Sequence, residues 1–151
     1  MMKTYLQKAI MLVALFVFAT TGASAQTMQD LHEKGKDLID LLVDELDQEV
    51  VHVEYDLIFS EPKEVFRTLA RGYTYKIIGF TDSRVSDLDL YVYKKQGSNW
   101  VEVGKDNKTD TTPIVTISPE ISGQYKFVIK VYSYNGDNDR ALWGLIISHE
   151  E

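Results

Sequence analysis

The chain contains no cysteine and only three histidines in 151 residues. Without cysteine no disulfide can form, so an exported form of the chain depends on its hydrophobic core or on bound metal. The same absence excludes a thiol nucleophile and a lipid-modified cysteine. The G-x-S-x-G and H-E-x-x-H motifs of hydrolases are also missing. The sequence therefore predicts no catalytic residue and no enzymatic activity.

Long apolar runs are scarce as well. The one clear run, "AIMLVALFVFA" at residues 9–19, is too short to span a bilayer about 30 Å thick. Basic residues precede it and small residues follow it, which predicts a signal peptide over residues 1–25, cleaved between Ala25 and Gln26. An uncleaved membrane anchor is the alternative. The expected product is secreted or periplasmic, with no membrane insertion after cleavage.

Basic residues are outnumbered by acidic ones, 16 against 23, which gives a net charge of −7. Removing Lys3 and Lys8 with the signal peptide leaves 14 basic residues and a net charge of −9. An acidic surface repels nucleic acid and anionic lipid, and neither is expected as a partner. The processed length fits a single domain.

Residues 28–48 predict one amphipathic helix, because apolar residues recur near the helical period while acidic residues occupy the other side. The apolar stripe consists of Leu31, Leu38, Ile39, Leu41, Leu42 and Leu46. Gly35 weakens the helix by about 1 kcal/mol relative to alanine. Such a helix is marginal alone in water, so we expect the stripe to pack against the rest of the domain.

After the helix the hydrophobic period changes from 3.6 to 2, and Gly, Asn, Asp and Pro separate the apolar segments. We expect a helical segment at 26–49 followed by a β-sandwich domain at 50–151. The strands of that domain are expected at 50–59, 64–70, 73–80, 87–94, 100–104, 113–118, 124–134 and 141–148. The predicted fold class is all-β, an antiparallel sandwich of about eight strands with one N-terminal helix.

Two apolar sets alternate along these strands. In the first strand the core-facing set is expected to be Val51, Val53, Tyr55, Leu57 and Phe59. The set expected to face away from the core is Ile58, Tyr91, Tyr93, Val128, Tyr132 and Ile146. If all of these were exposed together, the patch would be larger than soluble monomers usually show. Two interpretations stay open: the helix covers part of this patch, or the patch binds a partner.

Four segments occur in the order and spacing of a known family: "GYTYKIIGFTD" (72–82), "SDLDLYVYKKQGSNWVEVGKD" (86–106), "TTPIVTISPEISGQYKFVIKVYS" (111–133) and "ALWGLII" (141–147). Through them the chain resembles the bacterial pre-peptidase C-terminal domain family over roughly residues 55–148. The resemblance implies a secreted, non-catalytic jelly-roll module that assists folding or export, or binds a polymeric substrate. The helix has no counterpart in the family, whose members are usually appended to exoenzymes.

Asp87 and Asp89 lie two apart in a predicted strand, so their carboxylates share a face and repel unless water or a cation intervenes. Calcium takes six to eight oxygen ligands, and related collagen-binding domains bind it. The candidate calcium ligands are Asp82, Asp87, Asp89, Asp106 and Asp110. The alternative is that Asp87 caps a turn and Asp89 is solvated or bonds to backbone amides.

Trp100, Tyr132 and Tyr134 lie beside polar loops and are the candidate ligand-binding aromatics, because flat rings offer contact area at low entropic cost. Packing within the fold is the alternative for each ring, and it is the expectation for Tyr125 and Trp143. The predicted function is a binding module for an extracellular polymer, either polysaccharide or protein. The second hypothesis is a structural or chaperone-like envelope protein that docks on a separately encoded secreted exoenzyme.

Overall fold

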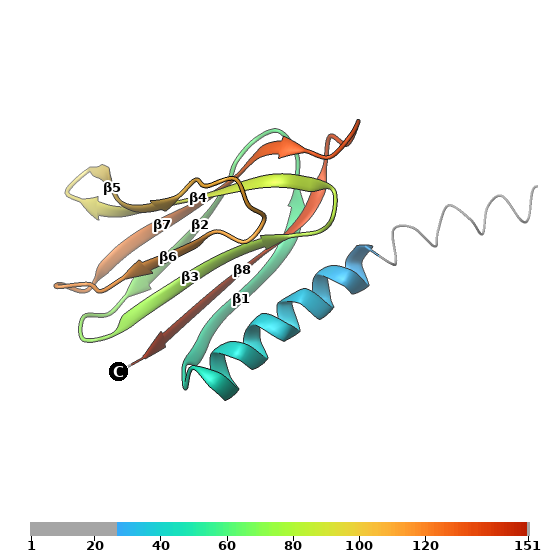
Figure 1. Cartoon of the computed structure of the whole chain (residues 1–151). Coiled ribbons are helices and arrows are strands. Elements are labelled where there is room, and N and C mark those ends of the chain that lie inside the picture. The colour runs from blue at the N-terminus through green and yellow to red at the C-terminus, as the bar shows by residue number, and fades with distance from the viewer. Residues whose placement is uncertain (1–26, 151) are drawn as a thin grey trace, which may run out of the picture.

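The computed structural model describes residues 27–150, which form one helix and two four-stranded sheets (Figure 1). An α-helix covers residues 27–40 and continues as a π-helical turn, η1 (Leu41–Glu45). The predicted signal peptide lies outside the described residues. Between residues 27 and 150 no helix combines the length and apolar character needed to cross a membrane.

Along the chain the strands alternate between the two sheets, except for one hairpin of two consecutive strands within the second sheet. They are β1 (Glu49–Ile58), β2 (Lys63–Leu69), β3 (Thr74–Thr81), β4 (Val85–Gln96), β5 (Asn99–Asp106), β6 (Ile114–Ile117), β7 (Gly123–Tyr134) and β8 (Ala141–Glu150). The first sheet has the order β1-β8-β3-β6 and the second β2-β7-β4-β5, with antiparallel neighbours throughout. This is the strand order of a jelly roll, so the predicted fold class is confirmed.

The main hydrophobic core fills the space between the two sheets. Its largest fully buried side chains include Leu88, Leu90, Tyr125, Phe127, Ile129, Trp143 and Leu145. The core positions predicted for Tyr125 and Trp143 are therefore confirmed. Because each strand buries every second residue here, the intervening residues point outward and need either a cover or solvent.

The helix provides that cover for the first sheet. Leu31 and Leu42 pack with Ile78, Phe80 and Ile146 in a second buried cluster, on the side of the sheet away from the main core. The prediction that the helix covers part of the second apolar set is confirmed for Ile146. Figure 1 shows the helix running beside β1 and β8, on the opposite side of the molecule from β4 and β7.

Two glycines make room for the ring of Phe80 under the helix. A Cβ atom on Gly35 would lie 3.1 Å from Phe80 Cζ and 2.3 Å from Tyr55 Oη. A Cβ atom on Gly144, in β8, would lie 2.2 Å from Phe80 Cζ. The helix can therefore approach this closely only because Gly35 has no side chain, which explains a residue that is otherwise unfavourable in a helix.

The end of the helix differs from the prediction. The predicted helix runs to residue 48, whereas the helical segment ends with the π-turn at Glu45. A π-turn takes more residues than an α-helical turn, so the side chains after it lose the phase of the stripe. Leu42 is buried, but Leu41 and Leu46, which were expected in the stripe, are exposed.

The predicted orientation of β1 is wrong. Ile58, expected to face away from the core, is buried in it, whereas Val51 and Phe59 are exposed. β1 is an edge strand, and its pairing with β8 is irregular between Val50 and His52. In this strand the alternation of apolar residues therefore does not predict which side chains face the core.

The even-numbered positions of β1 from His52 to Asp56 are polar because they meet β2 at the edge of the sandwich. Arg67 Nη2 lies 3.5 Å from Glu54 Oε2 and 2.8 Å from His52 Nε2. Lys63 Nζ donates to Asp56 Oδ2 at 3.0 Å. Basic side chains of one sheet thus pair with the acidic edge of the other, and His52, Glu54 and Asp56 have structural partners.

Replacing Leu42 by alanine tests the packing of the helix. Leu42→Ala removes a buried side chain from the second cluster, so we expect the free energy of unfolding to fall by about 2–5 kcal/mol in urea titrations. The matched control is Leu41→Ala, one residue earlier and exposed, for which a change within about 0.5 kcal/mol is expected. Equal effects of the two substitutions would contradict the described packing.

Candidate functional site

The outer face of the second sheet carries no helix, because the single helix in residues 27–150 packs on the other sheet. We call this surface the open face. Cross-strand pairs such as Phe66 with Lys126, and Lys126 with Tyr93, place side chains of different strands on it together. Its members are Glu64, Phe66 and Thr68 of β2, Gln124, Lys126, Val128, Lys130 and Tyr132 of β7, Asp89, Tyr91, Tyr93 and Lys95 of β4, and Trp100 and Glu102 of β5.

Four of the six apolar residues that were expected to face away from the core lie on the open face. Tyr91, Tyr93 and Val128 are half-buried on it, and Tyr132 is 70% exposed. These four residues point away from the core, as predicted, and the helix does not cover them. The open face therefore keeps apolar and aromatic side chains in contact with solvent, which is typical of an interaction surface.

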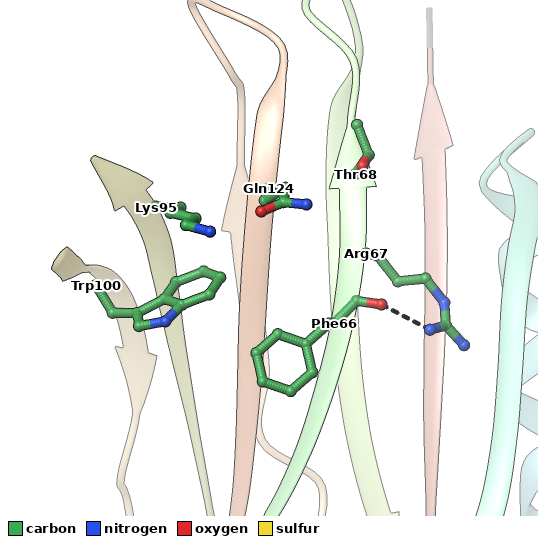
Figure 2. A pocket seen from close by; sticks show the side chains of 6 residues that line it. All are labelled: Phe66, Arg67, Thr68, Lys95, Trp100 and Gln124. Carbon is green, nitrogen blue, oxygen red and sulfur yellow. Dashed lines mark hydrogen bonds between the residues drawn. The ribbon is translucent and has the colours of Figure 1, made fainter. Parts of the chain in front are cut away.

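One end of the open face is hollowed into what we call the aromatic pocket, of about 480 Å³ (Figure 2). Its lining residues are Phe66, Arg67, Thr68, Lys95, Trp100 and Gln124. The rings of Phe66 and Trp100, from the two edge strands of the sheet, lean toward each other with centroids 5.6 Å apart. Arg67 turns away from them and donates from Nη1 to the carbonyl oxygen of Phe66 at 2.7 Å.

Two lysines accompany these rings. The ammonium groups of Lys95 and Lys126 lie 5.9 Å and 5.5 Å from the centroid of the Trp100 ring. Lys126 also lies 5.2 Å from the Tyr93 centroid and forms an ion pair of 2.9 Å with Glu64. Cation–π contacts of this kind hold the rings in place.

The other end of the open face forms the acidic pocket, of about 310 Å³. Its lining residues are Asp87, Asp89, Tyr91, Asn107, Thr109, Lys130 and Tyr132. Asp87 and Asp89 are only 6% and 4% exposed, and Tyr91 Oη donates to Asp89 Oδ2 at 3.1 Å. Asp87 Oδ1 is buried and has no hydrogen-bond partner among residues 27–150.

The electrostatics of the acidic pocket disfavour a second negative charge. Burial raises the pKa of the Asp87 carboxyl, and the neighbouring charge of Asp89 raises it further, while the backbone amide of Asp110 acts in the opposite direction. Burial and the hydrogen bond to Asp89 also raise the pKa of Tyr91. A cation that entered the pocket would stabilise the ionised Asp87 carboxylate and so act against this rise in its pKa.

The remaining predicted calcium ligands have partners elsewhere. Asp82 Oδ2 accepts from Arg84 Nε at 3.0 Å and from the backbone N–H of Leu142 at 2.9 Å. Its carboxylate therefore joins the β3–β4 turn to the start of β8. Asp82 is not among the residues that line the acidic pocket.

Asp106 and Asp110 stabilise the loop between β5 and β6. Asp106 Oδ2 accepts from the Ile114 N–H at 3.0 Å, and Asp110 Oδ1 accepts from the Thr112 N–H at 2.8 Å. Of the five predicted ligands, only Asp87 and Asp89 line the acidic pocket. Over the described part of the chain, no group of three or more His, Asp or Glu side chains is arranged to hold a metal ion. Calcium binding stays a prediction.

The three predicted ligand-binding aromatics occupy different places. Trp100 lines the aromatic pocket, and Tyr132 stands at the rim of the acidic pocket. Tyr134 packs against the main core, and its hydroxyl donates to the carbonyl oxygen of Phe59 at 2.9 Å. Phe66 was not predicted as a site residue from the sequence. Adjacent residues of a strand point to opposite faces, so an apolar Phe66 next to the core residue Val65 could have indicated an exposed ring.

No protein-family model matches the chain, and no curated protein matches it in sequence. The resemblance to the pre-peptidase C-terminal domain family therefore stays a prediction. Among solved structures, the chain is similar to PliG of Aeromonas hydrophila, a periplasmic inhibitor of g-type lysozyme, with a TM-score of 0.45 and 12% sequence identity. The match covers 66% of this chain and 85% of that one. Likeness at this level supports no inference about function.

The raised pKa of Asp87 predicts a pH-dependent effect of Asp87→Asn. Because folding raises the pKa of Asp87 above its ordinary value of 3.8, the folded protein is more stable when this carboxyl is protonated. This stability is fully present below pH 3.8 and is lost as pH rises through the raised pKa. Asp87→Asn should therefore raise the melting temperature at pH 7 by a few degrees, at about 4 °C per kcal/mol, and have little effect at pH 3.

The control for this measurement is Glu102→Gln, which removes an exposed carboxylate of the open face. Its melting temperature should stay close to that of the parent at both pH values. A lower melting temperature for Asp87→Asn at pH 7, or a gain of equal size at pH 3, would contradict the assigned electrostatics.

Proposed function

We propose that the chain is an exported, non-catalytic binding protein that engages an extracellular polymer or protein through the open face. The observation that carries this proposal is that the helix covers the outer face of only one of the two sheets. A helix covers the apolar outer residues of one sheet, whereas Phe66, Tyr93 and Trp100 lie on the other with no helix above them. Export rests on the predicted signal peptide.

The residues of the open face have the character of an interaction surface. Aromatic side chains are enriched where proteins bind partners, because their large contact area is buried at a low entropic cost. Phe66 is 50% exposed, and the paired rings of Phe66 and Trp100 leave the aromatic pocket open to solvent. A ligand that covers the pocket would bury both rings and gain the corresponding hydrophobic free energy.

The histidines support a non-catalytic role. His52 lies between Glu54 and Arg67 at the sandwich edge. His32 stacks on Tyr55, and His149 packs against Tyr73 with ring centroids 4.3 Å apart. Each histidine therefore has a packing or pairing role in the fold, apart from the two pockets of the open face.

The mixture of charges on the open face favours a protein partner as the second candidate. Lys95, Lys126 and Lys130 share this surface with Glu64 and Asp89, among other acidic groups. Charges of both signs complement another protein surface and fix its orientation. This reading corresponds to an envelope protein that docks on a separately encoded exoenzyme, in a structural or chaperone-like role.

Retention of the open-face variants tests the proposal. The processed chain, residues 26–151, is immobilised and exposed to periplasmic and secreted fractions of the source organism and to insoluble polysaccharides. The double variant Phe66→Ala, Trp100→Ala should lose at least about 30-fold in affinity for the retained partner, because even one central aromatic residue contributes about 2 kcal/mol at an interface.

The matched control is Phe59→Ala, which truncates the same residue type at 45% exposure, outside the two pockets. Its retention should equal that of the parent. A retained polysaccharide would identify the polymer form of the proposal, and a stoichiometric protein would identify the docking form. Retention that survives the double variant, or is absent with every fraction, would overturn the proposal.

A further inference from the structure

We infer that the acidic pocket is a binding site for a guanidinium group, supplied by an arginine side chain of a partner protein. The inference rests on the proposed binding function of the open face and names the chemistry of its second pocket. Four observations carry it: the two buried carboxylates, the unpartnered oxygen of Asp87, the aromatic side chains at the pocket, and its position on the same surface as the aromatic pocket.

The carboxylates have no internal counter-ion. Among residues 27–150, no basic side chain lies within ion-pair distance of Asp87 or Asp89. Lys130 pairs with Asp89 in the strand register, and its exposed side chain borders the pocket without closing such an ion pair. Burying two carboxylates without a cation destabilises a protein, so their presence calls for a function.

The geometry favours a guanidinium over a metal ion. Calcium requires six to eight oxygen ligands, and Asp82, Asp106 and Asp110, which could have contributed, bond to other groups. A guanidinium has five N–H donors in one plane, so it can donate to two carboxylates at once. Asp87 and Asp89, two residues apart on β4 and both lining the pocket, offer such a pair of acceptors.

The aromatic side chains of the acidic pocket add selectivity for an organic cation. Tyr132, at 70% the most exposed large hydrophobic side chain of residues 27–150, stands at the rim. Tyr91 lines the pocket while donating to Asp89. A guanidinium stacks on such a ring face, whereas a hydrated calcium ion gains little from it. The net charge of −7 further attracts a cationic partner.

The two pockets lie on one surface that a single partner can cover. β7 contributes Gln124 to the aromatic pocket and Lys130 and Tyr132 to the acidic pocket. Gln124 and Lys130 lie six positions apart along the strand, a distance of about 20 Å, which fits within a protein–protein interface of standard size. An arginine that enters the acidic pocket would thus orient the partner whose apolar group occupies the aromatic pocket.

The test is a titration of the ¹⁵N-labelled processed chain with N-acetyl-L-arginine amide, followed through the amide signals of residues 86–91 and 128–132. We expect saturable shifts with a dissociation constant on the order of 1 mM, as befits a ligand of this size. N-acetyl-L-citrulline amide, which is neutral and of the same shape, should produce none. N-acetyl-L-lysine amide should bind at least about threefold more weakly, because it cannot bridge both carboxylates.

Variants locate the site. Asp89→Asn should weaken binding of the arginine amide about tenfold or more, and Tyr132→Ala about two- to fivefold. Glu61→Gln, an exposed carboxylate between β1 and β2 that lies outside the open face and both pockets, should leave binding unchanged. Tyr132→Ala truncates an exposed side chain, so it remains informative if Asp89→Asn fails to fold.

Three outcomes would overturn the inference: equal shifts with citrulline amide, equal affinity for the lysine amide, or unchanged affinity in both Asp89→Asn and Tyr132→Ala. A calcium titration runs in parallel, and shifts of the same amides by calcium with none by the arginine amide would assign the pocket to calcium instead. If the parent chain does not bind the arginine amide but still retains a partner in a Phe66-dependent manner, this inference is overturned. The proposed function is then unaffected.

Discussion

The seating of one helix on one of two sheets is the constraint on which the rest of this structure depends. A two-layer sandwich has two outer faces, and a single helix can cover only one of them. Phe80, held between Gly35 and Gly144, fixes which face that is. The uncovered face then keeps its aromatic residues in contact with solvent. The candidate binding surface is thus exposed because the single helix of the described residues packs on the other sheet.

The two pockets of the open face differ in their energetic character. The aromatic pocket has its charges compensated in the free protein. Lys95 and Lys126 lie near its rings, and Glu64 forms an ion pair with Lys126. The acidic pocket lacks such compensation, because Asp87 and Asp89 are buried beside each other without a counter-ion within the described residues. Unfavourable burial of charge that persists in a folded domain is a common feature of functional sites.

Periodicity in the sequence was enough to predict the helix and all eight strands, because each follows from local alternation. The number and spacing of the strands then predicted the sandwich. Periodicity could not orient β1, where the core-side residues His52, Glu54 and Asp56 are polar and find their partners on β2, far along the chain. It placed Asp87 and Asp89 together because neighbours two apart share a strand face. It could not separate Asp82 from them, since the hydrogen bond from the Leu142 N–H arises only on folding.

The most direct test of the account is the accessibility of the two outer faces to a soluble paramagnetic gadolinium chelate, measured by proton relaxation in the processed chain. The account predicts strong relaxation enhancement for the ring protons of Phe66 and the indole protons of Trp100, and weak enhancement for Phe80 and the methyl groups of Ile146. Strong enhancement at Phe80 and Ile146, or protection of Phe66 and Trp100 at all protein concentrations, would contradict it.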